Sequence, residues 1–215
     1  MEGEKPKVII VTGTPGVGKT TVATELASTL SANLLSVSEL VQKENLVTES
    51  DKERGTIMAD MTRLRVRVRS MIGKAKKDIV IEGHYAYDVV PKALSPRIFV
   101  LRREPDDLEL KLRNRAYNEK KVSENVAAEV LDICLIGAMK RFGKDRLHEI
   151  DVTSMDVGMV VTEILVVLNG EKESKSGRVD WIAKLEEKGT LEKFLSSIVR
   201  VEGVEYGHLA DDRET

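Results

Sequence analysis

GTPGVGKT, at residues 13–20, is the stretch that decides the fold of this 215-residue chain. It matches the pattern G-x-x-x-x-G-K-[ST] in full. It stands between a β-branched apolar run at residues 7–12 and a segment at residues 20–30 whose apolar side chains recur at helical spacing. Strand, glycine-rich loop and helix in this order predict a P-loop, in which backbone N–H groups and the positive end of a helix dipole face one anion. The sequence therefore predicts binding of the triphosphate of ATP together with Mg²⁺.

Each part of this loop has an expected role. Lys19 is expected to reach the β and γ phosphates, and the Thr20 hydroxyl is expected to ligate Mg²⁺. The glycines let the backbone curl tightly enough for successive N–H groups to converge on one anion. The nucleotide-binding residues predicted in this segment are Gly13, Pro15, Gly16, Val17, Gly18, Lys19, Thr20 and Thr21.

The rest of the chain alternates between strand and helix patterns, which predicts an α/β fold with a parallel sheet covered by helices on both faces. Further strands are expected at residues 33–37, 78–82, 97–101 and 147–152, and helices at residues 38–43, 51–72, 105–115, 123–142 and 156–168. Ser123 is the expected N-cap of the helix at 123–142. In such a sheet the ligand binds at the carboxyl ends of the strands, where the P-loop lies.

One of these strand ends carries two candidate catalytic side chains. Glu82 ends the strand at 78–82, and it is the acid best placed to orient Mg²⁺ or its water ligands. His84 follows two residues later, and two interpretations of it stay open. It is either a group beside the γ phosphate or the attacking group, or a loop histidine bonded to backbone.

Arginines form a second set of candidates. Arg102 ends the strand at 97–101 and Arg115 ends the helix at 105–115, so both are candidates to contact phosphates, whose negative charge spreads during phosphoryl transfer. Residues 113–121 (RNRAYNEKK) crowd cations into a short connection between two helices, which is typical of a lid. The alternative is an ionic helix connection on the surface.

Composition excludes several classes of function. The 34 Lys and Arg nearly balance the 36 Asp and Glu, so no overall field marks a general nucleic-acid or membrane-surface binder. The first residues form no apolar signal core and no apolar run is long enough to span a bilayer, so a cytoplasmic protein without membrane contact is expected. The single cysteine, Cys134, lies in an apolar run and is expected to be a buried thiol. The Asn-Lys-x-Asp tetrapeptide that selects guanine does not occur, which favours ATP over GTP.

Three segments resemble one family when they are taken together: VTGTPGVGKTT at residues 11–21, EGH at 82–84 and RAYNEKK at 115–121. They are similar to an archaeal member of the adenylate kinase isoenzyme 6 family, the coilin-interacting nuclear ATPase group. The resemblance spans roughly residues 7–170 by motif order, and RAYNEKK is its most discriminating segment. It implies a P-loop NTPase fold of the nucleoside monophosphate kinase type, with a very short lid.

The resemblance also implies an activity and partners. Family members transfer a phosphoryl group from ATP to AMP, show ATPase activity, and act in maturation of the small ribosomal subunit, bound to a ribosomal protein and close to the 3′ end of its RNA. Residues 36–40 and the helix containing Asp60 would frame the AMP site, and Arg115 would belong to a lid at 115–121. By the same resemblance the nucleotide would be contacted by Arg102, Asn118 and Lys121.

The implied organisation is a kinase core at residues 1–170, with an AMP-binding insertion at about 34–75, followed by residues 171–215. The polar segment at 169–177 predicts a linker, and 178–200 predicts one or two helices ahead of a tail. The chain departs from the family in two ways. Its strand-end acid is Glu82 where the family commonly has Asp, which leaves direct or water-mediated magnesium contact open. The chain beyond Asn169 also exceeds the family core, and no function can be carried onto it.

Three functions remain open at this stage. The first is an ATP:AMP phosphotransferase with ATPase activity. The second is an ATP-driven assembly factor whose nucleotide cycle changes its grip on a ribosomal protein. The third is a small-metabolite kinase on the same scaffold. Binding without turnover is disfavoured, because a scaffold would need neither Lys19 and Thr20 nor a strand-end acid.

Overall fold

The core of the molecule is a five-stranded sheet with the strand order β2-β5-β1-β6-β7, in which all neighbouring strands are parallel. The computed structural model describes residues 6–51 and 56–194 of the chain. The strands are β1 (Val8–Gly13), β2 (Asn33–Ser36), β5 (Ile79–Glu82), β6 (Arg97–Arg102) and β7 (Leu147–Asp151). Because β1 and β5 are buried along their whole length, they are formed from β-branched apolar residues rather than from an alternating pattern. The predicted α/β parallel sheet is confirmed.

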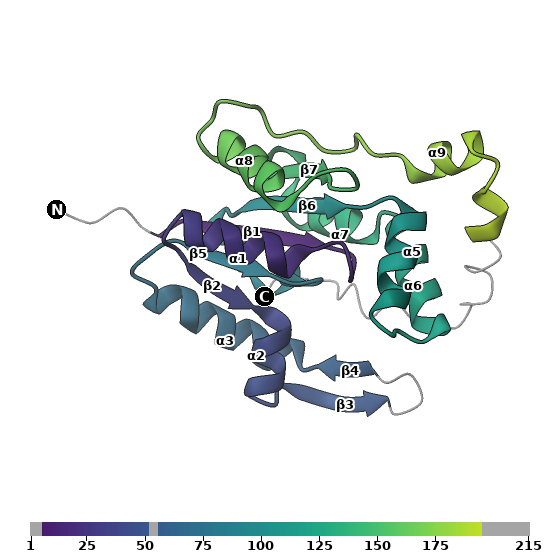
Figure 1. Cartoon of the computed structure of the whole chain (residues 1–215). Coiled ribbons are helices and arrows are strands. Elements are labelled where there is room, and N and C mark those ends of the chain that lie inside the picture. Colours follow the sequence, from purple (N-terminus) through teal and green to yellow (C-terminus); the bar gives the residue numbers. More distant parts are fainter. Residues whose placement is uncertain (1–5, 52–55, 195–215) are drawn as a thin grey trace.

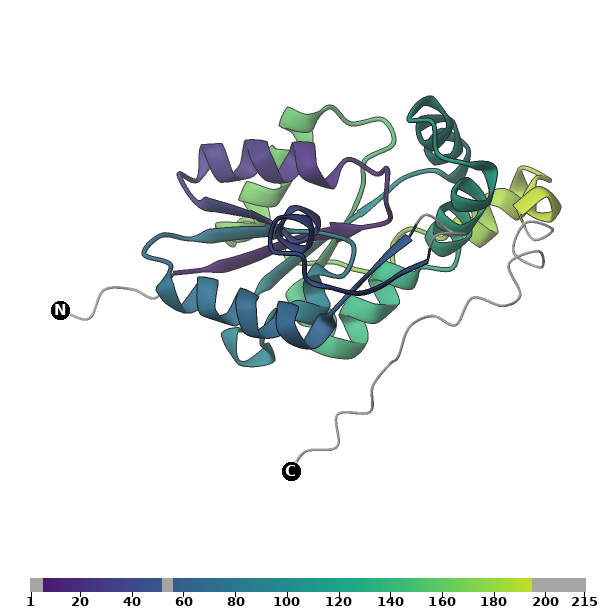
Figure 2. The same ribbon diagram turned by 90° about the horizontal axis from the view of Figure 1, so that it is seen from below.

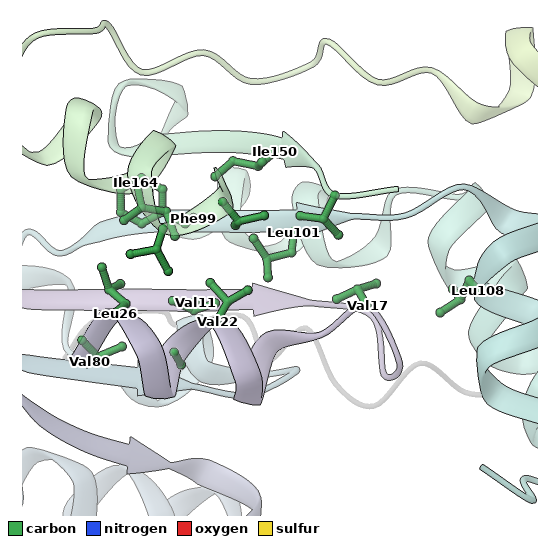
Figure 3. Packing of buried hydrophobic residues seen from close by; sticks show 14 of the residues in the cluster. Val11, Val17, Val22, Leu26, Val80, Phe99, Leu101, Leu108, Ile150 and Ile164 are labelled. Atoms are coloured by element: carbon green, nitrogen blue, oxygen red, sulfur yellow. The ribbon is translucent and has the colours of Figure 1, made fainter. Parts of the chain in front are cut away.

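Helices cover both faces of this sheet (Figures 1 and 2). On one face, α1 (Lys19–Thr29) and α8 (Val157–Leu168) pack against β1 and β6 through a cluster that includes Leu26, Phe99 and Ile164 (Figure 3). On the other face, α3 (Met61–Lys74), the short α4 (Ala86–Val89) and α7 (Ile133–Phe142) cover a second cluster. The chain therefore forms three layers around two apolar interfaces.

The remaining elements lie beyond the carboxyl ends of the strands, on the side toward which β1 points (Figures 1 and 2). They are α2 (Val37–Lys43), β3 (Val47–Asp51), β4 (Thr56–Ala59), α5 (Pro105–Asn114) and α6 (Glu119–Val130). Short 3-10 turns, η1 (Lys92–Leu94) and η2 (Lys144–Arg146), precede β6 and β7. The two groups α2–β3–β4 and α5–α6 stand on either side of the end of β1.

The prediction of one helix over residues 51–72 is wrong in its first part. Residues 47–51 and 56–59 form an antiparallel hairpin, and α3 begins only at Met61. Asp60 is the N-cap, because its Oδ1 accepts the Arg63 backbone N–H at 3.0 Å. The alternation of Arg and Val farther along matched a strand pattern as well as a helix, but Leu64, Val68 and Ile72 fall on one buried helical face. Residues 52–55 of the predicted helix lie outside the described part of the chain.

The predicted helix over residues 123–142 is in fact two helices. Helix α6 begins earlier, at Glu119, and its N-cap is Asn118 instead of Ser123; Asn118 Oδ1 accepts the Lys121 backbone N–H at 2.8 Å. The break falls at Asp132, which has a left-handed conformation with φ of 56°. A single such residue ends the regular hydrogen bonding and turns α7 onto the other face of the sheet.

The segment at residues 171–194, here called the C-terminal strap, is packed against the core. The sequence predicts a linker over its first residues, but there the Glu149 backbone N–H donates to the Lys175 carbonyl at 2.8 Å, and the Lys175 N–H donates to His148 Nδ1 at 3.1 Å. Helix α9 (Trp181–Glu187) follows and buries Trp181 and Leu185. The remainder of the predicted 178–200 helices and the predicted tail, from residue 195 on, lie outside the described residues.

In the part of the chain that the structure describes, no helix combines the length and the apolar character needed to cross a bilayer.

Candidate active site

The loop between β1 and α1 has the backbone of a phosphate cradle. Gly13, Gly16 and Gly18 have φ angles of 143°, 98° and 110°, a region that side chains with a Cβ rarely enter. Space is restricted as well, since a Cβ at Gly16 would lie 2.9 Å from both Leu108 and Leu112 of α5. Val17 fills the space between the loop and the core cluster (Figure 3). The loop is therefore held in shape by the core on one side and by α5 on the other.

The N-terminus of α1 is open to an anion. Its N-cap is Gly18, which has no side-chain capping bond, and its first turn contains no acidic residue. Thr20 and Thr21 are exposed in that first turn. Unsatisfied backbone N–H groups with a positive dipole end, and no competing carboxylate, fit a bound polyphosphate.

Lys19 lies inside the loop. Its Nζ donates a hydrogen bond to the Thr14 carbonyl oxygen at 3.0 Å. Burial lowers the pKa of Lys19 and the charge of Arg115 lowers it further, whereas the carboxylates of Glu82 and Glu129 oppose the shift. The structure thus brings together three of the side chains singled out in the sequence, namely Lys19, Glu82 and Arg115, and adds Glu129 to them.

Glu82 ends β5 directly beside the end of β1 and is almost fully buried. Its Oε1 accepts a hydrogen bond from Ser36 Oγ at 2.6 Å, and Ser36 ends the neighbouring strand β2. Within residues 6–51 and 56–194, no three His, Cys, Asp or Glu side chains cluster as a metal site would require. The Mg²⁺ contacts expected of the Thr20 hydroxyl and of Glu82 stay predictions.

His84 lies at the same strand end and touches the P-loop. Its Nδ1 is 3.4 Å from the Gly13 carbonyl oxygen and 3.2 Å from the sulfur of Cys134, which is buried as predicted. Desolvation, assisted by the charge of Lys19, lowers the pKa of His84 to about 4, so the ring is neutral at pH 7. Its contact with backbone fits the loop-histidine interpretation, and its position beside Lys19 fits the functional one.

Arg102 ends β6, as expected, but its side chain lies in the protein interior and not at the expected phosphate position. Its side chain is 1% exposed and donates to the carboxylates of Glu129, Glu149 and Asp132. Although burial works against the charge, these carboxylates raise the pKa of Arg102, which therefore stays cationic. Since its guanidinium nitrogens are engaged by carboxylates, contact with the nucleotide phosphates is not supported. Arg103, which follows β6, was missed by the sequence analysis. Its Nε donates a hydrogen bond to the Val17 carbonyl oxygen at 3.4 Å.

The predicted lid, residues 115–121, forms the tip of the α5–α6 pair. Arg115 is exposed at the end of α5, close enough to Lys19 to affect its pKa. Tyr117 is partly buried against the core cluster, and Lys121 Nζ lies 5.5 Å from the centre of its ring. Asn118 caps α6 with its side chain. Arg115 is thus exposed beside the P-loop, and Asn118 has a structural role as the N-cap of α6.

Sequence reasoning also missed Thr14, Glu129 and Trp181. The side-chain hydroxyl of Thr14 donates to Glu129 Oε2, and Trp181 Nε1 donates to Glu129 Oε1 at 2.9 Å. One signal was available, because Glu129 interrupts the apolar run Ala127, Ala128 and Val130, all of which are buried. A carboxylate in such a place requires partners.

The parallel sheet, the loop after its first strand and the acid at the end of the adjacent strand define a P-loop kinase of the nucleoside monophosphate kinase type. The family model described as AAA domain matches residues 9–132. A Methanocaldococcus jannaschii protein named "Putative adenylate kinase" is 37% identical over 184 residues, covering 86% of this chain and 98% of that protein. An Archaeoglobus fulgidus protein of the same name is 30% identical over 195 residues, covering 89% and 99%. The chain belongs to this family of archaeal nucleotide kinases.

Solved structures agree on the fold. Shikimate kinase from Acinetobacter baumannii superposes with a TM-score of 0.57 at 17% identity, covering 79% of this chain and 96% of that one. The tunicamycin resistance protein of Deinococcus radiodurans gives a TM-score of 0.51 at 14% identity, covering 80% and 99%. At such low identity the likeness concerns the arrangement of strands and helices alone.

Proposed function

We propose that the protein transfers the γ-phosphoryl group of ATP to AMP, forming two molecules of ADP. The observation that carries this proposal is the match to proteins named as adenylate kinases along nearly their whole length, since 98% of the M. jannaschii protein is covered. The position of α2, the β3–β4 hairpin and α3 gives further support. All three are inserted between β2 and β5; α3 covers one face of the sheet, whereas α2 and the hairpin lie beyond the strand ends, where an acceptor would face the P-loop (Figure 1).

The chain's own residues would act chiefly by position and charge. In the reaction an oxygen of the AMP phosphate attacks the γ phosphorus of ATP, and the bond from that phosphorus to the β–γ bridging oxygen breaks, which leaves ADP on both sides. Lys19 and the N–H groups of α1 would stabilise the charge on the transferred group, and Arg115 would close over it from the lid. Mg²⁺, held at the Thr20 hydroxyl, would neutralise β and γ oxygens, with Glu82 orienting its water ligands.

His84 would serve as a neutral group in this mechanism. Because its pKa is lowered to about 4, it adds no positive charge beside Lys19 at neutral pH. A neutral imidazole can donate or accept one hydrogen bond to a water or a phosphate oxygen. Phosphate attack needs no strong base, so a polar neutral group suffices here.

A coupled assay of ADP formation tests the proposal. With ATP and Mg²⁺ held constant, AMP should stimulate ADP formation strongly and saturably, with two ADP formed for each ATP consumed. ADP formation that is indifferent to AMP would support an ATPase whose cycle drives assembly. Transfer of phosphate to a small metabolite, in a screen of acceptors with labelled ATP, would support the metabolite kinase.

Several finer features stay predictions. Membership of the isoenzyme 6 group, a separate ATPase activity and a role in small-subunit maturation, with a ribosomal protein and ribosomal RNA as partners, rest on the resemblance. A cytoplasmic location rests on the sequence pattern. Co-purification of the full chain with small-subunit precursors, compared between Lys19→Ala and the unchanged protein, would test the ribosomal role independently of AMP turnover.

A further inference from the structure

Glu129 connects four separate segments of the chain at one buried carboxylate. It lies on α6 and is 2% exposed. Its Oε2 accepts the hydroxyl of Thr14 in the P-loop, and its Oε1 accepts Arg102 Nε at 2.8 Å, the Arg103 backbone N–H at 3.1 Å and Trp181 Nε1 at 2.9 Å. Both oxygens are therefore satisfied, and the orientation of the carboxylate is fixed from the end of β6 and from the strap.

The ion pairs around Arg102 hold Glu129 in place. The guanidinium lies among Glu129, Glu149 and Asp132, and it also donates to the Glu129 backbone carbonyl at 3.0 Å. One cation among three acids leaves a surplus of negative charge. Lys19 lies close enough to Glu129 for that charge to act on it. The buried arrangement thus favours a cation in the P-loop.

The C-terminal strap completes the arrangement. Glu149 Oε2 accepts the backbone N–H groups of Arg178 at 2.7 Å and Val179 at 3.3 Å, which brings Trp181 over the Arg102 side chain. Trp181 is 2% exposed and donates its indole N–H to Glu129. The strap is therefore fixed by the same carboxylates that surround Arg102.

Thr14 transmits this arrangement to the reacting group. Its hydroxyl is held by Glu129, while its carbonyl accepts Lys19 Nζ at 3.0 Å and the Val17 backbone N–H at 3.4 Å. We propose that Glu129 is a positioning residue for the ATP site, which acts through Thr14 on Lys19 and is itself held by Trp181 of the strap. The C-terminal segment thereby contributes to nucleotide affinity without touching the nucleotide. The proposal concerns the ATP side alone and holds for any acceptor.

Binding of a non-hydrolysable ATP analogue with Mg²⁺, measured by calorimetry, tests this. Thr14→Val keeps the shape and removes the hydroxyl, so the dissociation constant should rise about tenfold; Thr14→Ser restores the donor and should restore affinity. Trp181→Phe keeps an aromatic ring near Arg102 but removes the N–H donor at Glu129 and part of the buried ring, and should weaken binding about threefold. In turnover, both losses should appear in KM for ATP more than in kcat.

Glu163→Gln is the matched control. Glu163 also holds the strap, directly through Lys172 at 2.6 Å and indirectly through His148 at 3.0 Å, whose ring accepts the Lys175 N–H. Among the described residues it forms no hydrogen bond or ion pair with Arg102, with the carboxylates around Arg102 or with the P-loop. This variant should alter thermal stability without changing analogue affinity. If it weakens binding as much as Trp181→Phe does, the effect of the strap is general stability and the proposal fails.

A double-mutant cycle gives the sharper outcome. If Trp181 acts through Glu129 on Thr14, the two losses are not independent, and the Thr14→Val, Trp181→Phe double variant should bind no worse than about tenfold more weakly than the unchanged protein. Multiplied, independent losses near thirtyfold would refute the coupling. Unchanged affinity in Thr14→Val, with its melting temperature preserved, would refute the positioning role itself.

Discussion

The Nζ atom of Lys19 is hydrogen-bonded to the carbonyl oxygen of Thr14, 3.0 Å away, within the same loop. The loop thus holds the ammonium group of Lys19 at the place where the β and γ phosphates of a nucleotide would lie. A bound phosphate would replace one backbone oxygen as the partner of this ammonium group, so the side chain needs little rearrangement before reaction.

Replacing Lys19 by Ala should abolish turnover while keeping the fold. Removal of a positioned charge at the transferred phosphoryl group is expected to lower kcat by at least about two orders of magnitude. The half-buried side chain contributes little packing, so the melting temperature should stay close to that of the unchanged protein. Initial rates and a thermal melt measure the two effects, and turnover at the original rate would contradict the role given to Lys19.

His84 should make stability depend on pH on the acidic side. Its pKa is about 4 in the folded protein against the ordinary histidine value of 6.5, so the unfolded chain takes up the proton first as the pH falls. The stabilising contribution is complete above pH 6.5 and is lost as the pH falls toward 4. His84→Asn removes this titration and should flatten the stability profile across that window, by an amount on the order of 1–3 kcal/mol. Parallel profiles for the two proteins would contradict the shift.

His84→Ala should also slow the chemical step, by less than the Lys19 variant does. The ring lies beside the loop without contributing a charge, so its loss removes only a hydrogen-bonding group. We expect a lower kcat with little change in the dissociation constant for ATP. An unaltered rate would leave the loop-histidine interpretation as the correct one.

Two glycines should respond oppositely to the same substitution. Gly16→Ala forces a Cβ against Leu108 and Leu112 at φ of 98°, and should lower the free energy of unfolding by about 1–3 kcal/mol and weaken ATP binding. Gly73 lies exposed near the end of α3 with no atom within 4 Å of an added Cβ. Gly73→Ala should therefore stabilise the protein by roughly 0.5–1 kcal/mol and leave activity unchanged. Chemical denaturation measures both.

Glu82 should determine the magnesium requirement. Glu82→Gln removes the charge with little change in shape, and a higher Mg²⁺ concentration should be needed for half-maximal rate. Ser36→Ala is the comparison that keeps the carboxylate: it removes the hydrogen bond that Ser36 donates to Oε1 at 2.6 Å, together with the hydroxyl that caps α2. Glu82→Asp retains a carboxylate. The Mg²⁺ concentration that this variant needs for half-maximal rate separates direct from water-mediated contact of the carboxylate with the metal. If Glu82→Gln shows the original magnesium dependence, the carboxylate has no part in holding the metal.

Two roles of Asn118 can be told apart by mutation: the N-cap of α6 and the predicted contact with the nucleotide. Asn118→Ala removes the acceptor for the Lys121 N–H and should cost about 1 kcal/mol of stability, whereas Asn118→Asp keeps an acceptor at the helix start. If the cap is its whole role, Asn118→Asp should also keep KM for ATP. A stable Asn118→Asp protein with a raised KM would instead support the predicted nucleotide contact.

The central features of the fold could be predicted because their signals are local. A glycine-rich loop between a β-branched run and a helical run specifies both conformation and ligand within residues 7–30, and the buried strand at 78–82 follows from its own composition. The hairpin at 47–59 carried no comparable signal, because its strands are short and one face holds polar residues such as Thr48. The conformation of that segment is determined by tertiary packing and not by a local sequence pattern.

The site could be predicted only where a motif names its residues. Lys19, Glu82 and His84 meet because the ends of the two neighbouring strands β1 and β5 are adjacent, which the strand order explains. The burial of Arg102 depends on Glu129 and Glu149, which are distant in sequence and come together only when α6 and β7 pack. A strand-end arginine has the same pattern in sequence whether it faces a phosphate or a buried carboxylate.

The placement of β1 has a consequence for biosynthesis. Among the described strands, the first in chain order is the middle strand of the sheet, flanked by residues 79–82 and 97–102. In a nascent chain that ends before residue 79, both edges of this apolar strand are therefore unpaired. The P-loop also lacks the later segments against which it packs. Cotranslational folding of this kinase must wait for roughly the first half of the polypeptide, and during that interval chaperone protection of residues 8–13 would matter most.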